Sequence, residues 1–287
     1  FIVLSGFSGL REFSLQFTNV FDADLKVYSY QGKSLQFTEE LENRISNIKG
    51  IEAYTKIIEE RVFIQYRGKN HVAKIKGVDL SFKHVISIDS ILFLNNWLTP
   101  NHDEVVIGLG ISKKLSLGVL DYGNLLEIYI PKPGGGQILN AVDAFYKKRA
   151  VVSGMYSINE ELDSEYIFSD IDYARSLLAM KPNEVTSIEI KLSSVANEDF
   201  IKSEIKSIFN KNVTVKNRMQ QNDGLYKMLN IENLFVYLFV SLIAAIAIFN
   251  ITGTIIMIII DKRDNIKTLV SLGLTIKDIK KIFFYNG

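Results

Sequence analysis

The chain of 287 residues carries 33 basic and 32 acidic side chains, so it is nearly neutral and lacks the large basic field that drives nucleic-acid binding. Cysteine is absent, which excludes disulfides and thiolate chemistry. The three histidines, His71, His84 and His102, are scattered without the H-x-H or H-E-x-x-H spacing of a metal site, so we expect no metal in the chain.

Both ends of the chain lie in apolar sequence. The first ten residues, FIVLSGFSGL, are too few for a membrane span, which needs about 20 apolar residues, and they lack the features of a signal peptide. We expect residues 1–11 to be the end of a first transmembrane helix, with a buried terminal strand or helix as the alternative. The last residues, KIFFYNG, predict the start of a further span at 276–287, so we expect the chain to be a piece of a longer one.

Residues 12–230 predict a folded α+β domain, whose first part is 20–78. DADLKVYSY at 22–30 is a strand candidate, and FTEELENRISNIKG at 37–50 predicts a helix that Thr38 caps and Gly50 stops. AYTKIIEERVFIQY and HVAKIKGVD predict two long strands joined by a turn at 67–70.

A mostly-β part is expected at 79–181. EVVIGLGISKKLSLG at 104–118 predicts a strand, a turn and a short helix, and LLEIYI and AVVSGM predict two further strands. DSEYIFSDIDYARSLLAM predicts a strand that leads into a helix capped by Asp170, and Asp121, Asp163 and Asp172 are expected in turns and caps. No carboxylate pair or nucleophile–base set is present, so we expect a non-catalytic chain.

The segment 131–149 is too long for a plain hairpin. About eighteen residues separate LLEIYI from AVVSGM, where a hairpin loop needs about two to five. Because exposed apolar groups favour a covering partner, we interpret this segment as a partner-binding loop; a disordered or self-packed insertion is the alternative. Its candidate contact residues are Pro131, Pro133, Ile138, Leu139, Val142, Phe145, Tyr146, Lys147, Lys148 and Arg149.

A second strand–helix–strand unit occupies 183–218. TSIEIKL and NVTVKN predict strands, and NEDFIKSEIKSIF predicts a helix between them that Asn197 caps. The apolar face of this helix has the same +4, +3 spacing as that of the helix at 37–50. The two units therefore predict one shared sheet, from which 79–181 is a separable insertion, although chance similarity of amphipathic helices is the alternative.

A membrane-spanning helix is predicted at 231–260, because the 28 residues from Asn233 to Ile260 carry no charge. Lysine and arginine number six in 261–281 and three in 213–232, which places the C-terminal side in the cytoplasm and 12–230 outside it. Asn250 is expected to make an interhelical hydrogen bond.

A short cytoplasmic helix is predicted at 261–275. Ile266, Leu269 and Val270 share one side of it, and Gly273 can end it in the left-handed conformation. Thr275 and Asp278 form a capping-box-like start for the next helix. Such a helix, held between two spans, can dock in a groove of another protein; a plain connector on the membrane surface is the alternative.

This order of segments resembles the FtsX/MacB-type ABC transporter permeases, and among them most resembles the lipoprotein-releasing (Lol-type) permeases. The most specific match is residues 230–279, above all FNI in the span and LVSLGLT after it. FIVLSGFSGLRE, GVD, EVVIGLGISKKLSLG and LLEIYIP match at corresponding places. Gly123-Asn124 stands where the family often has Gly-Asp.

The resemblance implies a non-catalytic permease subunit of the bacterial inner membrane that works as a homo- or heterodimer with a cytoplasmic ABC ATPase. ATP would be bound by that partner, so no cofactor is expected here. The family's porter-like subdomain would comprise 20–78 and 183–218, and its sabre-like subdomain 79–181. Contacts with the ATPase would come from Asp264, Ile266, Leu269, Val270 and Gly273, and the 131–149 hook would bind a periplasmic chaperone that receives lipoproteins.

Three other functions stay open at this point. One is a MacB-like efflux permease for a drug or peptide, and another is an FtsX-like regulator of cell-wall hydrolases, whose extracytoplasmic domain is usually much smaller. The third, a signalling receptor, would continue into a long soluble segment, whereas this chain returns to apolar sequence after about twenty residues.

Overall fold

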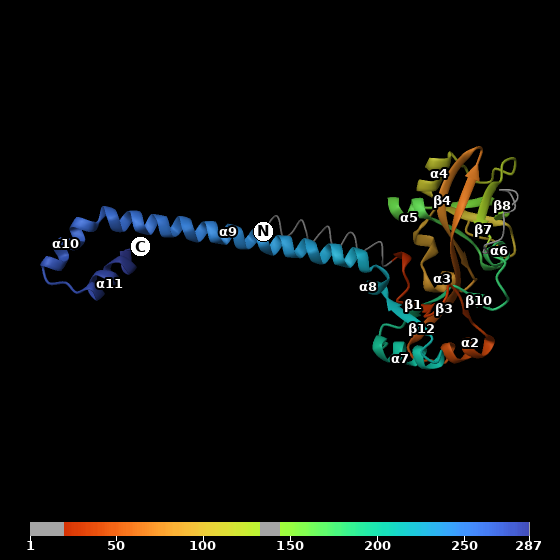
Figure 1. Ribbon diagram of the computed structural model, residues 1–287, viewed down its shortest axis with the longest axis horizontal. Coiled ribbons are helices and arrows are strands. Elements are labelled where there is room, and N and C mark those ends of the chain that lie inside the picture. Colours follow the sequence, from red (N-terminus) through yellow and green to blue (C-terminus); the bar gives the residue numbers. More distant parts are fainter. Residues whose placement is uncertain (1–19, 133–143, 287) are drawn as a thin grey trace. The chain divides into compact units, whose positions relative to one another are not determined.

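The computed structural model describes residues 20–132 and 144–286, and the chain divides after Asp223 into two units (Figure 1). The first unit is an α+β domain, and the second is helical. Each unit is described by itself below.

Within the described residues, the first unit is built on one ten-stranded sheet with strand order β12-β1-β11-β3-β4-β9-β6-β8-β5, and β7 pairs with both β3 and β8. A small second sheet joins β10 and β2. The strands are β1 (Leu25–Ser29), β2 (Leu35–Gln36), β3 (Ile51–Tyr66), β4 (Lys69–Val78), β5 (Leu92–Asn95), β6 (Glu104–Gly108), β7 (Leu126–Pro131), β8 (Phe145–Tyr156), β9 (Tyr166–Asp170), β10 (Glu184–Val185), β11 (Ser187–Leu192) and β12 (Val213–Asn217).

The helices of this unit are short. They are α2 (Glu39–Ser46), α3 (Phe82–Val85), α4 (Leu109–Leu115), α5 (Glu160–Glu165), α6 (Ile171–Leu177), α7 (Glu198–Ile208) and α8 (Arg218–Gln221), with a 3-10 turn at Ile88–Ser90.

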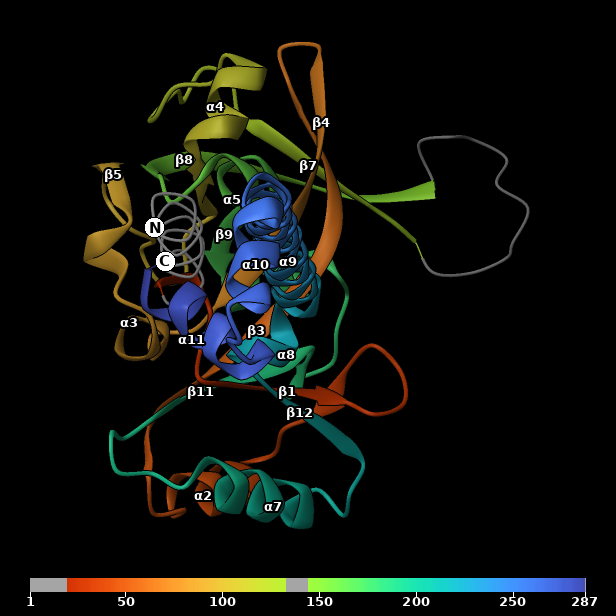
Figure 2. The ribbon, with the colours of Figure 1, turned by 90° about the vertical axis from the view of Figure 1, so that its left-hand side faces the viewer.

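The two strand–helix–strand units do share one sheet, as their common rhythm predicted. β1 pairs antiparallel with β11, with Val27 opposite Ile188, and β11 pairs antiparallel with β3. Helices α2 and α7 lie side by side (Figure 2) and contact each other. Ile45 of α2 and Ile201 of α7 are fully buried in the core beneath them.

The strands of 79–181 continue this sheet and close part of it into a ring. Following the pairings from β3 through β4, β9, β6, β8 and β7 returns to β3. Apolar side chains such as Ile64, Ile75, Ile107 and Ile128, each fully buried, belong to the core of this part. The long hairpin β3–β4 is therefore common to both parts, and the separability of 79–181 stays a prediction.

Local signals account for several element ends. Arg67 and Gly68 turn the chain between β3 and β4 with φ of 45° and 77°, the positive pair that a two-residue hairpin turn requires. Asn197 caps α7 by accepting from the backbone N–H of Phe200, and Asp170 caps α6 by accepting from that of Asp172. These two caps confirm the sequence predictions.

The prediction for the helix at 37–50 was wrong in part. α2 ends at Ser46, four residues before Gly50, and the Thr38 side chain makes no capping hydrogen bond. Gly50 has φ of +102° and lies against α7, where an added Cβ would come within 3.0 Å of Ile201 Cδ1. The need for Gly50 is therefore explained by close packing between the two strand–helix–strand units and not by a helix end.

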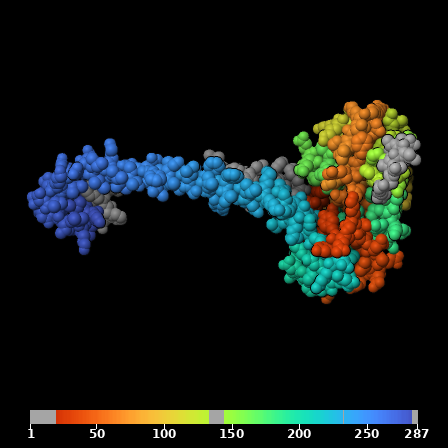
Figure 3. Space-filling view, in the orientation of Figure 1, coloured from red at the N-terminus to blue at the C-terminus, as the bar shows by residue number. Residues whose placement is uncertain are grey.

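The second unit consists of α9 (Asp223–Asp261), α10 (Arg263–Ser271) and α11 (Ile276–Asn286). Among the described residues, α9 is the one helix long and apolar enough to cross a membrane, and 6% of its most apolar window is buried inside the structure. Its side chains stand exposed in the space-filling view (Figure 3), with Phe249 77% exposed. The helix begins at Asp223, earlier than the predicted 231, because no Gly or Pro stands between Leu225 and the uncharged run to end it.

Hydroxyl groups on α9 bond to the carbonyls of their own helix. Ser241 donates to the carbonyl oxygen of Leu238 at 2.8 Å, and Thr252 donates to that of Ile248 at 2.8 Å. This arrangement suits a lipid environment, which offers no water to satisfy a polar group.

Candidate partner-binding surfaces

Strands β7 and β8 form the hairpin that contains the predicted partner-binding loop. Pro131 lies opposite Phe145 in the register, and the N–H of Lys132 donates to the carbonyl oxygen of Ala144 at 2.8 Å. Pro133, Ile138, Leu139 and Val142 lie outside the described residues.

The prediction that Phe145 to Arg149 belong to a loop was wrong, because strand β8 already begins at Phe145. Cross-strand contacts extend the strand: the Phe145 ring lies 6.4 Å from the Tyr129 ring in a T-shaped pair, and Glu127 lies opposite Arg149. Such cross-strand pairs are the units that stabilise a sheet. Glu127, the acidic residue in the strand that ends at Pro131, was the sequence signal that could have placed the basic residues up to Arg149 in a paired strand.

The basic residues at the start of β8 are paired within the fold. Lys147 Nζ and Arg149 Nε lie 2.8 and 3.0 Å from Glu127 Oε1. Chiefly through the hydrogen bond from Lys147, these partners lower the pKa of Glu127 to about 2. Lys148 instead donates to Ser176 Oγ at 2.5 Å and lies over the Tyr173 ring. These charges are held on a surface rather than carried at the end of a loop.

A cavity of about 610 Å³ lies beside the hairpin, and three of the predicted residues line it: Pro131, Phe145 and Tyr146. Phe63 and Val72, neighbours across β3 and β4, line it too and are 37% and 53% exposed. The remaining apolar lining comes from Val62, Ile130, Leu178 and Met180. The sequence prediction missed Phe63 and Val72, although each stands between inward-facing residues on an alternating strand.

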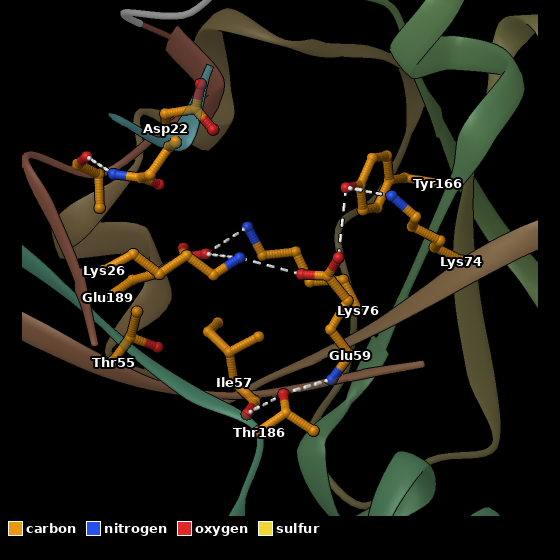
Figure 4. Close-up of polar contacts among 12 residues, drawn as sticks. Asp22, Lys26, Thr55, Ile57, Glu59, Lys74, Lys76, Tyr166, Thr186 and Glu189 are labelled. Atoms are coloured by element: carbon orange, nitrogen blue, oxygen red, sulfur yellow. Dashed lines mark hydrogen bonds and ion pairs between the residues drawn. The ribbon is translucent and has the colours of Figure 1, made fainter. Parts of the chain in front are cut away.

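A buried charge network crosses the other end of the sheet (Figure 4). Lys76 on β4 and Lys26 on β1 both reach Glu189 Oε1 on β11, at 2.9 and 3.1 Å. Lys26 also contacts Glu59 Oε2 at 3.0 Å, and the Tyr166 hydroxyl donates to Glu59 Oε1 at 3.3 Å. Lys76 and Glu189 are 1% and 2% exposed.

Opposite charges decide the ionisation of this network, overcoming burial. Burial raises the pKa of Glu189, but Lys76 and Lys26 lower it more, so the pKa stays below its ordinary value of 4.5. Burial likewise lowers the pKa of Lys26, and Glu189 and Glu59 raise it well above 10.5. Lys26 and Glu189 are therefore ionised at neutral pH. The sequence did not reveal the network, because single charges on alternating strands look like solvent-facing positions.

Helix α10 carries the predicted ATPase-coupling residues. Ile266 and Leu269 are partly exposed and Val270 is 50% exposed, while Asp264 pairs with Lys267 at 3.0 Å. The helix ends as predicted, because Gly273 has φ of +96°.

Two hydrogen bonds complete the helix end that Gly273 makes possible. Its N–H donates to the carbonyl oxygen of Val270, and the N–H of Leu274 donates to that of Leu269, which together form a Schellman motif. The predicted start of α11 is confirmed too, since the N–H groups of Thr275 and Asp278 each bond to the other residue's side chain.

Comparison with known proteins finds relatives but no matching family model. LolC of the lipoprotein-releasing system of Buchnera aphidicola subsp. Schizaphis graminum is 26% identical over 84% of this chain and 58% of its own length. LolE of Haemophilus influenzae is 23% identical over 87% and 59%, and LolC of Neisseria meningitidis is 23% identical over 88% and 59%. The chain thus spans less than two thirds of these relatives.

Among solved structures, the periplasmic region of MacB from Actinobacillus actinomycetemcomitans is 15% identical, with a TM-score of 0.48 over 72% of this chain and 92% of that one. The extracellular domain of the transporter YknZ is 13% identical, with a TM-score of 0.47 over 67% and 99%.

The relatives, all named as transmembrane proteins, match a chain that joins an α+β domain to a helix able to span a bilayer. These findings support a membrane protein. The chain is similar to the LolC and LolE transmembrane proteins of lipoprotein-releasing systems, which confirms the resemblance to the lipoprotein-releasing permeases seen in its sequence.

Proposed function

We propose that this chain is a permease subunit of an ABC transporter of the bacterial inner membrane that releases lipoproteins to a periplasmic chaperone. The observation that carries the proposal is the similarity to LolC and LolE, which extends over 84% to 88% of the chain. ATP would be bound and hydrolysed by a separate cytoplasmic subunit. A second permease subunit, identical or related, would complete the pair of transmembrane partners.

In this proposal, α10 receives the motion of the ATPase. Its side chains Ile266, Leu269 and Val270 offer an apolar face that is partly open to a partner. The Schellman end at Gly273 fixes the direction in which the chain leaves the helix, so a push on α10 passes into α11 instead of being absorbed by a loose turn. An amphipathic helix that lies in a groove of its partner is a common mode of protein recognition.

The experiment compares Leu269→Asp with Thr268→Asp in the complete transporter reconstituted in vesicles. Leu269→Asp places a charge on the apolar face, so we expect a loss of lipoprotein release and of substrate-stimulated ATP hydrolysis, with membrane insertion unchanged. Thr268 lies on the opposite side of α10 by helical spacing, so its variant should behave as the wild type. If Leu269→Asp keeps both activities, α10 is only a connector.

The β7–β8 hairpin would serve the partner on the other side of the membrane. We infer that the chaperone covers the apolar cavity lined by Pro131, Phe145 and Tyr146. Phe145 and Phe63, at 38% and 37% exposed, supply apolar area at the cavity. Lys147 and Arg149, held by Glu127, would border the interface with fixed charges. The porter-like (20–78 and 183–218) and sabre-like (79–181) parts would then divide the work, since the hairpin belongs to the second.

A further inference from the structure

The folded domain begins and ends at one edge of its sheet. The incoming segment, residues 20–24, leads into β1, and the outgoing segment, residues 217–222, begins at the last residue of β12 and precedes α9. Because β1 and β12 pair antiparallel with Leu25 opposite Asn217, the two segments lie next to each other. The connections of the domain to the rest of the chain therefore leave from neighbouring positions.

Polar contacts join these two segments directly. Arg218 Nε donates to the carbonyl oxygen of Asp22 at 3.1 Å, and Arg218 Nη2 lies 3.2 Å from Asp24 Oδ1. Gln221 Nε2 donates to the carbonyl oxygen of Ala23 at 3.0 Å. Asn222 Nδ2 donates to Asp22 Oδ2 at 2.7 Å. We call this set the junction clamp: Asp22, Ala23, Asp24, Arg218, Gln221 and Asn222.

Local geometry holds each half of the clamp in place. On the outgoing side, Asn217 and Gln220 form a capping box, since each side chain accepts from the other residue's backbone N–H, and this fixes the start of α8 beneath Arg218. On the incoming side, Asp24 Oδ2 accepts from the N–H of Leu192 at 2.7 Å, which ties the segment to the end of β11. The capping box on the outgoing side and the hydrogen bond to β11 on the incoming side therefore preorganise the clamp.

Phe21 anchors the incoming segment in the core of the domain. Its side chain is 7% exposed, and its ring lies 5.0 Å from that of Tyr166 and 6.2 Å from that of Phe168. Lys76 Nζ lies 4.7 Å from the centre of the same ring while pairing with Glu189. The incoming segment thus contacts the buried charge network, which spans four strands of the sheet.

We propose that the junction clamp makes the two connections of the domain a single rigid joint, so that they move together. This inference rests on the proposed function, in which motion reaches the domain from membrane segments. Without the clamp, the incoming and outgoing segments could open independently, and a displacement of one would distort the edge of the sheet instead of moving the domain. Arg218 is the central positioning residue, because it bonds to both Asp22 and Asp24.

Hydrogen–deuterium exchange on the full chain in detergent tests the joint without any transport assay. In Arg218→Ala, we expect amide exchange in 20–24 and in 217–222 to rise together by about tenfold, because hydrogen bonds to a charged group are lost, with β3 unchanged. Arg218→Lys, which can keep the pair with Asp24, should show a smaller rise. Arg67→Ala is the matched control, because it breaks an exposed arginine–aspartate pair elsewhere on the domain.

If amide exchange in Arg218→Ala rises in 217–222 alone, or in neither segment, the proposal of a single rigid joint is wrong. The transport role is tested separately in the assembled transporter, as lipoprotein released per ATP hydrolysed. Arg218→Ala should lower this ratio severalfold while ATP hydrolysis continues, and Arg67→Ala should leave it unchanged. An unchanged ratio in Arg218→Ala would overturn the coupling role. If the wild type releases no lipoprotein, the proposed function fails, and the exchange result still decides whether the joint exists.

Discussion

Two lysine–glutamate pairs in the sheet have nearly the same distance between nitrogen and oxygen but differ in how deeply they are buried. In the buried charge network, Lys76 Nζ lies 2.9 Å from Glu189 Oε1, and both side chains are almost fully buried. On the β7–β8 hairpin, Lys147 Nζ lies 2.8 Å from Glu127 Oε1, with the side chains 39% and 22% exposed. Distance alone does not distinguish the two pairs.

The difference in burial separates a structural pair from one available to a partner. Removing one member of a buried pair leaves the other charged in a low-dielectric core, whereas water compensates a charge left at the surface. The network therefore cannot lose one member without a large cost in stability, while the hairpin charges can exchange an internal partner for an external one at small cost. Each prediction below tests this contrast.

The largest effect is expected from Lys76→Met, which leaves Glu189 buried with less compensation. We expect a loss of about 3–5 kcal/mol in the free energy of unfolding of the domain, measured by chemical denaturation of the full chain. Lys76→Met combined with Glu189→Leu should recover most of this loss, because the buried charge is then removed. A loss below about 1 kcal/mol for the single variant would mean that water reaches the network.

Acid should destabilise the domain through the network. The pKa values of Glu59 and Glu189 lie below their ordinary value of 4.5, mainly because Lys26 and Lys76 overcome the effect of burial. The stability they contribute is present above pH 4.5 and is lost as the pH falls through their lowered pKa values. Asp22 acts in the opposite sense, because burial raises its pKa above 3.8.

Urea denaturation at pH 7 and at a pH near 3 measures this dependence. Glu189→Gln should shrink the difference between the two conditions, and Asp22→Asn should enlarge it. A wild-type domain equally stable at both pH values would contradict the assignment of these carboxylates as ionised and paired.

Phe145→Ser tests the cavity side of the comparison. Truncating a hot-spot aromatic at an interface costs about 2 kcal/mol or more in binding, so with Phe145 as such an anchor we expect chaperone capture in a pull-down titration to weaken by about thirtyfold. Tyr122→Ser is the matched control, since Tyr122 is 71% exposed and does not line the cavity. Equal capture by both variants would remove the cavity from the interface.

The smallest effect is expected from Glu127→Gln, which keeps an acceptor oxygen but removes the negative charge shared by Lys147 and Arg149. Because this group lies at the surface, we expect the free energy of unfolding to fall by less than about 1 kcal/mol. A loss as large as that of Lys76→Met would erase the distinction between the two regions.

Several features of this protein followed from the sequence alone. The uncharged run from Asn233 to Ile260 predicted α9, and Gly273 with the Thr275–Asp278 pair predicted where α10 ends and α11 begins. The turn at Arg67–Gly68 predicted the β3–β4 hairpin. These features are local, because the hydrogen bonds that make them join residues a few positions apart, so the residues present decide the outcome.

Other features were decided only by the tertiary structure. β8 begins at Phe145 because β7 lies opposite it, and the ring closes because β7 also pairs with β3. Lys76 and Glu189 are a buried pair rather than two surface charges because β11, β1 and the incoming segment bring their side chains and Phe21 together. These contacts join residues distant in the sequence, and local spacing carries no information about which distant partner will exclude water.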